Sequence, residues 1–210
     1  MKKTYYLVSL GCAKNSVDSE SMAELLERSG YTAVEKASKA GMLIVNTCGF
    51  IQQARQESLD VLQELATGKK PGQYLIAAGC LSERYRERLV QSVPGIDGII
   101  GSRRWMDILE LVEELRQAKQ GPRYHLPDAP TIGRDEKGVL RVAMQGASAY
   151  LKIADGCRRP CAFCSIPLIK GPPVSRPIET IIEEAEYLQA HGIQEINLIA
   201  QDTTDYGSDL

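Results

Sequence analysis

Short β-rich apolar runs alternate with segments of helical periodicity along the first 118 residues of this chain. The expected strands cover residues 5–10, 42–47, 73–78 and 96–100. Four helices are expected. Asp18 or Ser19 can cap the first of them, and the others cover residues 50–66, 82–91 and 105–118. The run over 42–47 shows no polar alternation, which is typical of a strand buried on both faces of a parallel sheet. The sequence therefore predicts an α/β fold whose parallel sheet is covered by helices on both faces.

The alternation stops over residues 119–146, where prolines and glycines are frequent and a short strand is expected over 139–144. It resumes with a strand over 150–153, a cysteine-rich loop, a helix over 177–191 and a strand over 195–200. We therefore expect an amino-terminal domain over 1–118, a linker over 119–146 and a second domain over 147–210. A single strand–helix–strand unit cannot enclose a core of its own, so we expect the second domain to be incomplete.

Composition excludes several classes of protein. The chain has 25 Lys and Arg against 27 Asp and Glu, so a generally basic nucleic-acid coat protein is excluded. Two Phe and one Trp are too few for an aromatic base-stacking platform, and no apolar run is long enough to span a bilayer. The segment 1–12 resembles a lipoprotein signal but carries Thr, Ser and two Tyr, so we interpret it as a strand. We expect a cytoplasmic protein without a membrane partner, in which spaced cysteines indicate metal binding or catalysis.

Three of the six cysteines each follow an expected strand, namely Cys12, Cys48 and Cys80. The carboxyl ends of parallel strands lie at one edge of a sheet, where α/β proteins bind their ligands. Three residues far apart in the sequence can therefore meet there. We expect the neighbouring Gly11, Gly49 and Gly79 to let a bulky ligand approach the backbone. The alternative for any one of these three cysteines is that it serves as a small apolar side chain buried in the core.

The other three cysteines, Cys157, Cys161 and Cys164, lie in one short loop. Three thiolates can bind three irons of a 4Fe–4S cluster and leave the fourth iron open. A zinc site would need a fourth ligand at finger-like spacing, and no suitable residue follows. His191 is distant and is expected at the carboxyl end of a helix.

The motif Cys157-x3-Cys161-x2-Cys164, with Phe163 before its last cysteine, resembles the signature of radical S-adenosylmethionine enzymes. The amino-terminal domain with Cys12, Cys48 and Cys80 resembles the cluster-binding domain of methylthiotransferases. The resemblance implies a parallel-sheet methylthiotransferase domain followed by the first βαβ unit of a radical S-adenosylmethionine barrel. It also implies two 4Fe–4S clusters, one on each cysteine triplet, with S-adenosylmethionine at the cluster of Cys157 and Phe163 near its adenine.

Two branches of this family differ in substrate. Residues 9–20 (SLGCAKNSVDSE) and 201–207 (QDTTDYG) resemble the branch that modifies an aspartate of the twelfth small-subunit ribosomal protein. The transfer-RNA branch tends to carry Gln-Met-Asn and Gln-Asn-Val-Asn at those places. The resemblance implies methylthiolation of the aspartate β-carbon by a radical mechanism, with an external electron donor. Two alternatives stay open: a transfer-RNA adenosine methylthiotransferase and a non-catalytic iron–sulfur fragment.

The same resemblance implies a longer chain, with a fuller barrel and a small β domain. We therefore expect these 210 residues alone to be inactive. No catalytic side chain is assigned from the sequence.

Several polar residues near the cysteines have two interpretations each. Lys14, Asn15 and Asp18 could orient the cluster of Cys12 or cap the following helix, and capping is favoured for Asp18. The basic residues of the second cysteine loop could steer a substrate or form a solvated surface, namely Arg158, Arg159, Lys170 and Arg176. The segment 202–204 follows the last expected strand, where barrel enzymes collect catalytic residues and where a helix cap is the alternative.

Overall fold

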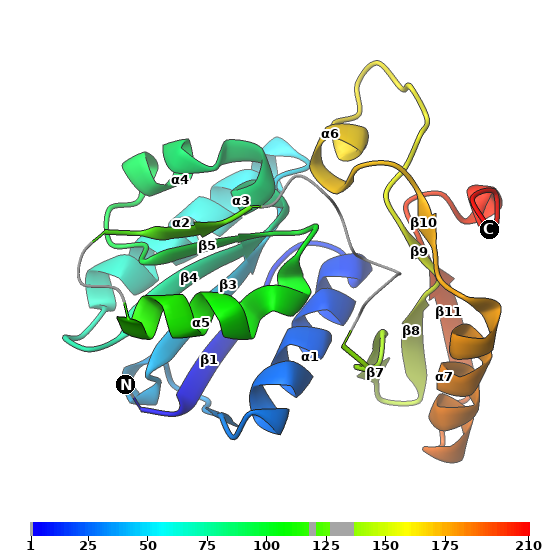
Figure 1. Cartoon of the computed structure of the whole chain (residues 1–210), viewed down its shortest axis with the longest axis horizontal. Coiled ribbons are helices and arrows are strands. Elements are labelled where there is room, and N and C mark those ends of the chain that lie inside the picture. Colours follow the sequence, from blue (N-terminus) through cyan, green and yellow to red (C-terminus); the bar gives the residue numbers. More distant parts are fainter. Residues whose placement is uncertain (1, 118–120, 127–136) are drawn as a thin grey trace.

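The structure of the chain is a computed structural model that describes residues 2–117, 121–126 and 137–210. Two α/β units lie side by side, and the amino-terminal unit is the larger (Figure 1). Its sheet has the strand order β2-β1-β3-β4-β5-β6, with every neighbouring pair parallel. The strands are β1 Thr4–Ser9, β2 Thr32–Ala33, β3 Met42–Thr47, β4 Tyr74–Gly79, β5 Gly98–Gly101 and β6 Arg123–His125. The predicted parallel sheet is confirmed, and the lipoprotein-like start is strand β1.

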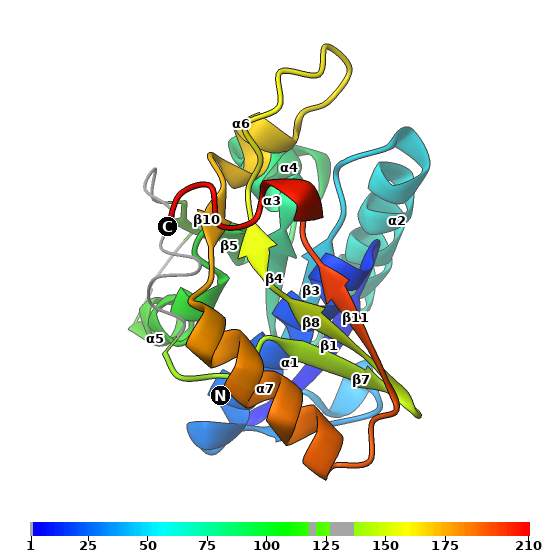
Figure 2. The same cartoon turned by 90° about the vertical axis from the view of Figure 1, so that its right-hand side faces the viewer.

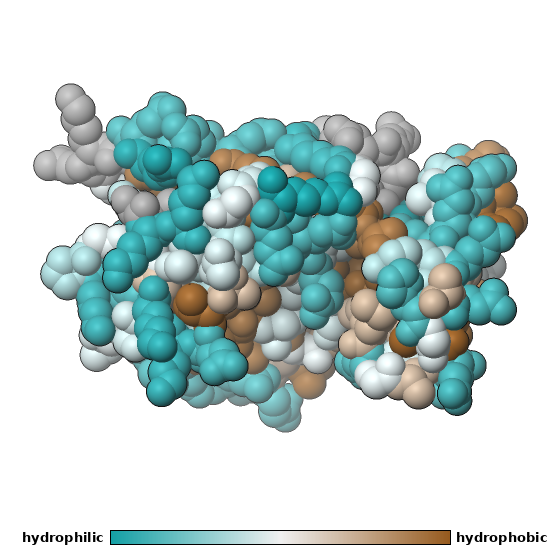
Figure 3. Space-filling model, turned by 90° about the horizontal axis from the view of Figure 1, so that it is seen from below, coloured by the Kyte–Doolittle hydropathy of each residue, from teal (hydrophilic) through white to brown (hydrophobic). Residues whose placement is uncertain are grey.

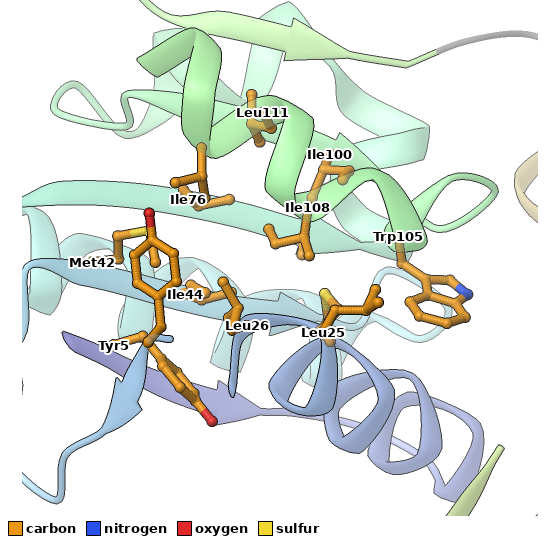
Figure 4. Close-up of a cluster of buried hydrophobic side chains, with 14 of the residues drawn as sticks. Tyr5, Leu25, Leu26, Met42, Ile44, Ile76, Ile100, Trp105, Ile108 and Leu111 are labelled. Atoms are coloured by element: carbon orange, nitrogen blue, oxygen red, sulfur yellow. The ribbon is translucent and has the colours of Figure 1, made fainter. Parts of the chain in front are cut away.

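Helices cover both faces of this sheet (Figure 1). They are α1 Ala13–Arg28, α2 Gln52–Gly68, α3 Cys80–Tyr85, α4 Glu87–Ser92 and α5 Ile108–Gln117, with short 3-10 turns η1 Ala37–Lys39 and η2 Trp105–Asp107. Alternate residues of each strand point to opposite faces, so Met42 and Ile44 join one core while Leu43 and Val45 join the other. Figure 4 shows the first core, where α1 and α5 meet the sheet around Ile44 and Ile76.

Two helices differ from their expected form. The helix expected over 82–91 is divided into α3 and α4 at Arg86, whose φ of 44° lies in the left-handed region and interrupts a continuous helix. Helix α1 begins five residues before Asp18, and its cap position is Cys12. Asp18 therefore lies inside the helix and is buried, so the expectation that it caps α1 is wrong.

The carboxyl-terminal unit contains a second sheet of strand order β11-β8-β7. Its strands are β7 Val142–Gln145, β8 Ser148–Lys152 and β11 Glu195–Ile199. Strands β8 and β11 are parallel and are connected through α7, Ile178–Ala190, which confirms the predicted βαβ unit. Figure 2 shows α7 lying across this sheet. The loop between β8 and α7 holds β9 Ala154–Asp155, α6 Ile166–Lys170 and β10 Val174–Ser175, and η3 Thr203–Asp205 follows β11.

The span expected to be a linker takes part in both sheets. Strand β6 extends the first sheet by pairing with β5, and β7 forms a hairpin with β8 in the second. The prolines and glycine at 127, 130 and 133, on which the linker expectation partly rests, lie outside the described residues. The domain boundaries themselves stay a prediction.

The second unit leaves much apolar surface exposed. Leu188 of α7 packs fully against β8, whereas Ile182 of the same helix and Leu198 of β11 are each about half exposed. Hydrophobic residues also reach the surface among polar ones in the right-hand part of Figure 3. In the described part of the chain, no helix has both the length and the apolar character needed to cross a membrane.

Candidate iron–sulfur site

Strand register places the three amino-terminal cysteines at one edge of the first sheet. Thr47 at the end of β3 pairs with Gly79 at the end of β4, and Cys48 and Cys80 are the next residues of these strands. Cys12 follows β1, which pairs with β3 on its other side, and it occupies the cap position of α1. The convergence expected from the parallel sheet is therefore observed.

Two asparagines hold this edge together. The side-chain amide of Asn15 donates to the backbone oxygens of Leu10 (2.8 Å) and Thr47 (3.0 Å), which ties the turn of Cys12 to the end of β3. Asn46 donates to the backbone oxygen of Asn15 and to Ser19 Oγ, both at 2.9 Å. Cys80 Sγ lies 4.0 Å from Asn15 Oδ1. Asn15 therefore holds the backbone next to Cys12 and Cys48 and contacts the side chain of Cys80, a role that the sequence left open between orienting and capping.

The packing of the cysteine edge requires glycine at two positions. A Cβ on Gly11 would lie 2.6 Å from Cys48 Cβ, and a Cβ on Gly79 would lie 2.3 Å from Asn46 Oδ1. Both residues also have positive φ, of 97° and 90°, which favours glycine. Gly11 and Gly79 therefore make room for neighbouring protein atoms that pack the cysteine edge. That they also let a ligand approach the backbone stays a prediction.

Burial shapes the chemistry of these thiols. Cys48 and Cys80 are buried, while Cys12 is exposed. Burial raises the pKa of Cys48, and it raises the pKa of Cys80 to about 12, although the positive charge of Lys170 acts in the opposite direction. A buried thiol with a raised pKa is a poor free nucleophile. Metal binding would instead have to displace its proton.

The carboxyl-terminal cysteines lie on a loop shaped by backbone hydrogen bonds. The Cys157 amide donates to Gly171 O at 3.1 Å, and the Cys164 amide donates to Cys161 O at 3.0 Å. Two further amides donate to sulfur, Arg159 N to Cys157 Sγ at 3.4 Å and Ile166 N to Cys164 Sγ at 3.5 Å. Amide donors of this kind stabilise thiolate sulfur.

One glycine fixes where this loop leaves the sheet. A Cβ on Gly156 would lie 2.0 Å from Pro172 O, and Gly156 has a φ of 77°. The segment before Cys157 therefore packs directly against the segment after Lys170, and only glycine fits between them.

All six cysteines line one cavity of about 1120 Å³. The cavity lies between the carboxyl edge of the first sheet and the cysteine loop, and it also contacts Phe163, Lys170 and Gln201. Its volume is slightly above the roughly 300–1,000 Å³ typical of small-molecule sites. The two cysteine triplets therefore share one site, although their first members, Cys12 and Cys157, are about 145 residues apart in the sequence.

The donor set of the cavity fits iron–sulfur clusters. All six thiols are free, and thiolates are the ligands that iron–sulfur clusters use. Neither His125 nor His191 lines the cavity, so neither is placed to act as an additional ligand. Each triplet offers one thiol fewer than a closed cluster needs, so each could leave one iron open.

A second group of potential ligands does not form a convincing metal site. Within the described ranges, Asp107, Glu110 and His125 are the one set of three whose donor atoms lie within 4.8 Å of one another. The ammonium of Lys137 contacts Asp107 (3.1 Å) and Glu110 (2.9 Å), and Arg104 pairs with Asp107 at 2.6 Å. These two cations already neutralise the carboxylates, and they would repel a metal ion.

The structure separates the basic residues that the sequence grouped together. Arg158 pairs with Asp205 at 2.6 Å and Arg159 with Asp202 at 2.7 Å, and both arginines are about half exposed. Asp202 also accepts from Thr204 N at 3.1 Å, so it caps η3. The cap interpretation of this segment is therefore confirmed, and the two arginines fasten the cysteine loop to it.

Lys170 and Arg176 are neither a steering surface nor a solvated one, because both are buried. Arg176 makes two hydrogen bonds to the Glu184 carboxylate, at 2.8 and 2.6 Å. Lys170 pairs with Asp18 at 3.1 Å. Both expectations fail for the same reason: a long charged side chain can be buried when a carboxylate meets it.

Lys170 belongs to a buried charge cluster that sequence reasoning missed, which consists of Asp18, Arg141, Lys152, Asp155 and Lys170. The cluster joins α1 of the first unit to β8, β9 and α6 of the second. One signal was present in the sequence, since Lys152 stands within the apolar run Leu151–Ile153. A charged residue inside a strand pattern indicates either an exposed edge or a buried partner.

Comparison with known proteins divides the chain as the two units do. Residues 4–101 match the family described as "Uncharacterized protein family UPF0004", and residues 151–209 match the radical SAM superfamily. Among curated relatives, the "Ribosomal protein uS12 methylthiotransferase RimO" of Symbiobacterium thermophilum is 47% identical over 97% of this chain. The proteins of the same name from Roseiflexus sp. and Myxococcus xanthus are 43% and 44% identical over 98% and 99% of it. This chain belongs to the radical S-adenosylmethionine methylthiotransferase family.

The match covers only part of these relatives. The chain spans 42%, 47% and 43% of the length of the proteins from S. thermophilum, Roseiflexus sp. and M. xanthus, that is, about half or slightly less. Among solved structures, the radical S-adenosylmethionine methyltransferase TsrM from Kitasatospora setae matches 96% of this chain and 48% of its own, with a TM-score of 0.64 and 14% identity. At that identity the likeness concerns the fold alone.

Proposed function

We propose that this chain provides the cluster-binding part of an enzyme that methylthiolates an aspartate β-carbon of ribosomal protein uS12. The observation that carries the proposal is the single cavity lined by Cys12, Cys48, Cys80, Cys157, Cys161 and Cys164. The name shared by relatives that are 43–47% identical supports the substrate. The six free cysteines also support a reducing compartment, and we place the protein in the cytoplasm.

In this proposal each triplet holds one 4Fe–4S cluster through three thiolates. When bound, the cluster of the carboxyl-terminal triplet supplies the one-electron reduction of S-adenosylmethionine, and the other cluster supplies sulfur. The chain's own residues orient these groups. Asn15 and Asn46 hold the edge of Cys12, Cys48 and Cys80, and the backbone amides of the cysteine loop stabilise thiolate at Cys157 and Cys164.

The exposed face of the cavity suits the remaining reactants. Phe163 is 89% exposed and lines the cavity, so its ring is free to pack against the adenine of S-adenosylmethionine. Gln201 also lines the cavity, and its side-chain oxygen is buried without a hydrogen-bond partner in the described structure. An unsatisfied acceptor in this position would be completed by a donor of the bound cofactor. An external electron donor would reduce the cluster from the exposed side of Cys161.

The activity test uses uS12 itself. The reconstituted chain, and a longer protein that continues to the length of the relatives, would each be incubated with uS12, S-adenosylmethionine and a reductant. Mass spectrometry of uS12 should find a methylthio group on one aspartate after incubation with the longer protein, and little after incubation with the 210-residue chain. Methylthiolation of transfer RNA adenosine in place of uS12 would contradict the substrate. A longer protein that holds iron and modifies neither would support a non-catalytic iron–sulfur role.

A further inference from the structure

The buried charge cluster lies directly behind the cysteine cavity. Asp18 Oδ1 receives the Lys152 ammonium at 2.8 Å, and Asp18 Oδ2 receives the Lys170 ammonium at 3.1 Å. Asp155, which belongs to the second unit, contacts both lysines. All of these side chains are at least nine-tenths buried. Within this cluster, Lys170 lines the cavity, whereas Lys152 does not.

The position of Lys170 connects the two cysteine triplets. It ends helix α6, which begins two residues after Cys164. Helix α6 packs against α3, whose first residue is Cys80. Lys170 therefore comes from the cysteine loop of the second unit but acts at the cysteine edge of the first. Lys170 and Cys80 both line the cavity.

The hydrogen bonds of Lys170 leave donor capacity toward the cavity. An ammonium carries three N–H donors. In the described structure Lys170 makes one hydrogen bond, to Asp18 Oδ2, and one longer ion pair, to Asp155 Oδ1 at 3.5 Å. Lys170 is only 3% exposed and lines the cavity, so an acceptor for the remaining donor has to lie in that cavity. A buried donor without a partner is costly, and sulfur held in the adjoining cavity would satisfy it.

We propose that Lys170 is a positioning residue that donates an N–H···S hydrogen bond to the sulfur of the cluster held by Cys12, Cys48 and Cys80. The inference rests on the proposed function, because it needs a cluster at that triplet. Hydrogen bonds to sulfur and nearby positive charge both raise the reduction potential of iron–sulfur clusters. Lys170 would therefore make this cluster easier to reduce than the same cluster without the lysine.

A purely structural role is the competing explanation, and Lys152 provides the matched control. Lys152 pairs with the same two carboxylates and is equally buried, but it does not line the cavity. Loss of either lysine weakens the junction between the units. Only loss of Lys170 removes a donor next to the cluster sulfur.

The experiment uses the full chain with Cys157, Cys161 and Cys164 replaced by alanine, so that one cluster is present. Side-chain nitrogen of lysine is labelled isotopically, and the reduced cluster is measured by pulsed electron paramagnetic resonance. A lysine nitrogen coupling is expected, which Lys170→Met removes and Lys152→Met retains. The reduction potential should fall in Lys170→Met, stay near the parent value in Lys152→Met, and be largely restored in Lys170→Arg.

Each other outcome decides against the inference. If the protein that retains Lys170 holds the cluster but shows no lysine nitrogen coupling, the inference is overturned. This measurement needs no substitution of Lys170, so the test stands even if Lys170→Met fails to fold. Equal potential shifts in Lys170→Met and Lys152→Met would assign both residues to the structural junction. A parent protein that holds no iron would overturn the proposed clusters, and with them this inference, whereas iron without coupling overturns the inference alone.

Discussion

The Asp18 carboxylate on helix α1 accepts a hydrogen bond at 2.8 Å from the Lys152 ammonium on strand β8, 134 positions further along the chain. Both residues are buried, and Arg141 and Lys170 contact the same carboxylate. The contact joins the unit matched by the UPF0004 family to the unit matched by the radical SAM superfamily. The cysteine cavity lies between these two units, so this carboxylate helps to determine how the two triplets face each other.

Asp18→Asn should destabilise the protein by about 3–5 kcal/mol, the usual cost of removing one partner from a buried ion pair. Three buried cations would lose their shared carboxylate in this variant. The free energy of unfolding would be measured by denaturant titration. The control is Asp60→Asn on the exposed surface of α2, where Asp60 meets Gln56, and it should change that free energy by less than about 0.5 kcal/mol. Equal effects of the two substitutions would contradict the assigned role of Asp18.

The contribution of Asp18 should also depend on pH. Burial alone would raise the pKa of Asp18, but Lys152, Lys170 and Arg141 hold it well below its usual range. A carboxyl whose pKa is lower in the folded state stabilises the protein fully above its unfolded pKa of about 3.9, and this stabilisation is lost as the pH falls below that value. The difference in unfolding free energy between the natural protein and Asp18→Asn should be constant from about pH 7 to pH 5, and it should shrink below about pH 4. A difference that instead grows on acidification would have the wrong sign.

The iron content should divide between the two triplets. After anaerobic reconstitution the chain should hold about two 4Fe–4S clusters. Alanine at Cys157, Cys161 and Cys164 should remove about half of the iron, and alanine at Cys12, Cys48 and Cys80 should remove the other half. Iron and sulfide analysis would be paired with circular dichroism to confirm that both variants fold. Complete loss of iron from either variant, or zinc in place of iron, would contradict two independent cluster sites.

Gly11→Ala tests the packing of the amino-terminal cysteine edge. The added Cβ would meet Cys48 Cβ at 2.6 Å and Sγ at 3.0 Å, and a side chain at a φ of 97° costs roughly 1–2 kcal/mol. We expect lower stability together with loss of the cluster at this triplet, measured by thermal unfolding and iron content.

Gly72→Ala is the matched control for Gly11→Ala. Its φ of 84° is also positive, but no atom lies within 4 Å of the added Cβ. Gly72→Ala should lose stability for the same backbone reason as Gly11→Ala, and it should keep all of its iron. Loss of iron in both variants would show that general destabilisation, rather than displacement of Cys48, removes the cluster.

Much of the amino-terminal unit could be predicted because its pattern is local. The apolar run of β3 and the turns that follow β1, β3 and β4 are short-range features, and they place Cys12, Cys48 and Cys80 at strand ends. Parallel pairing then brings strand ends to one edge, whichever strands are neighbours. The loop of Cys157, Cys161 and Cys164 could be recognised for a similar reason, since its ligands lie within eight residues.

The sequence by itself therefore determined the α/β alternation, the βαβ unit after β8 and the two separate cysteine triplets. Only the tertiary structure decided that the triplets share one cavity and that Asp18, Lys152 and Lys170 meet behind it. Spacing along the chain reports which residues share a strand end, a loop or a helix face. It does not report which distant charges are buried together, because that depends on how two separately patterned units pack, and the cost of burying each charge is offset only when all of its partners are in place.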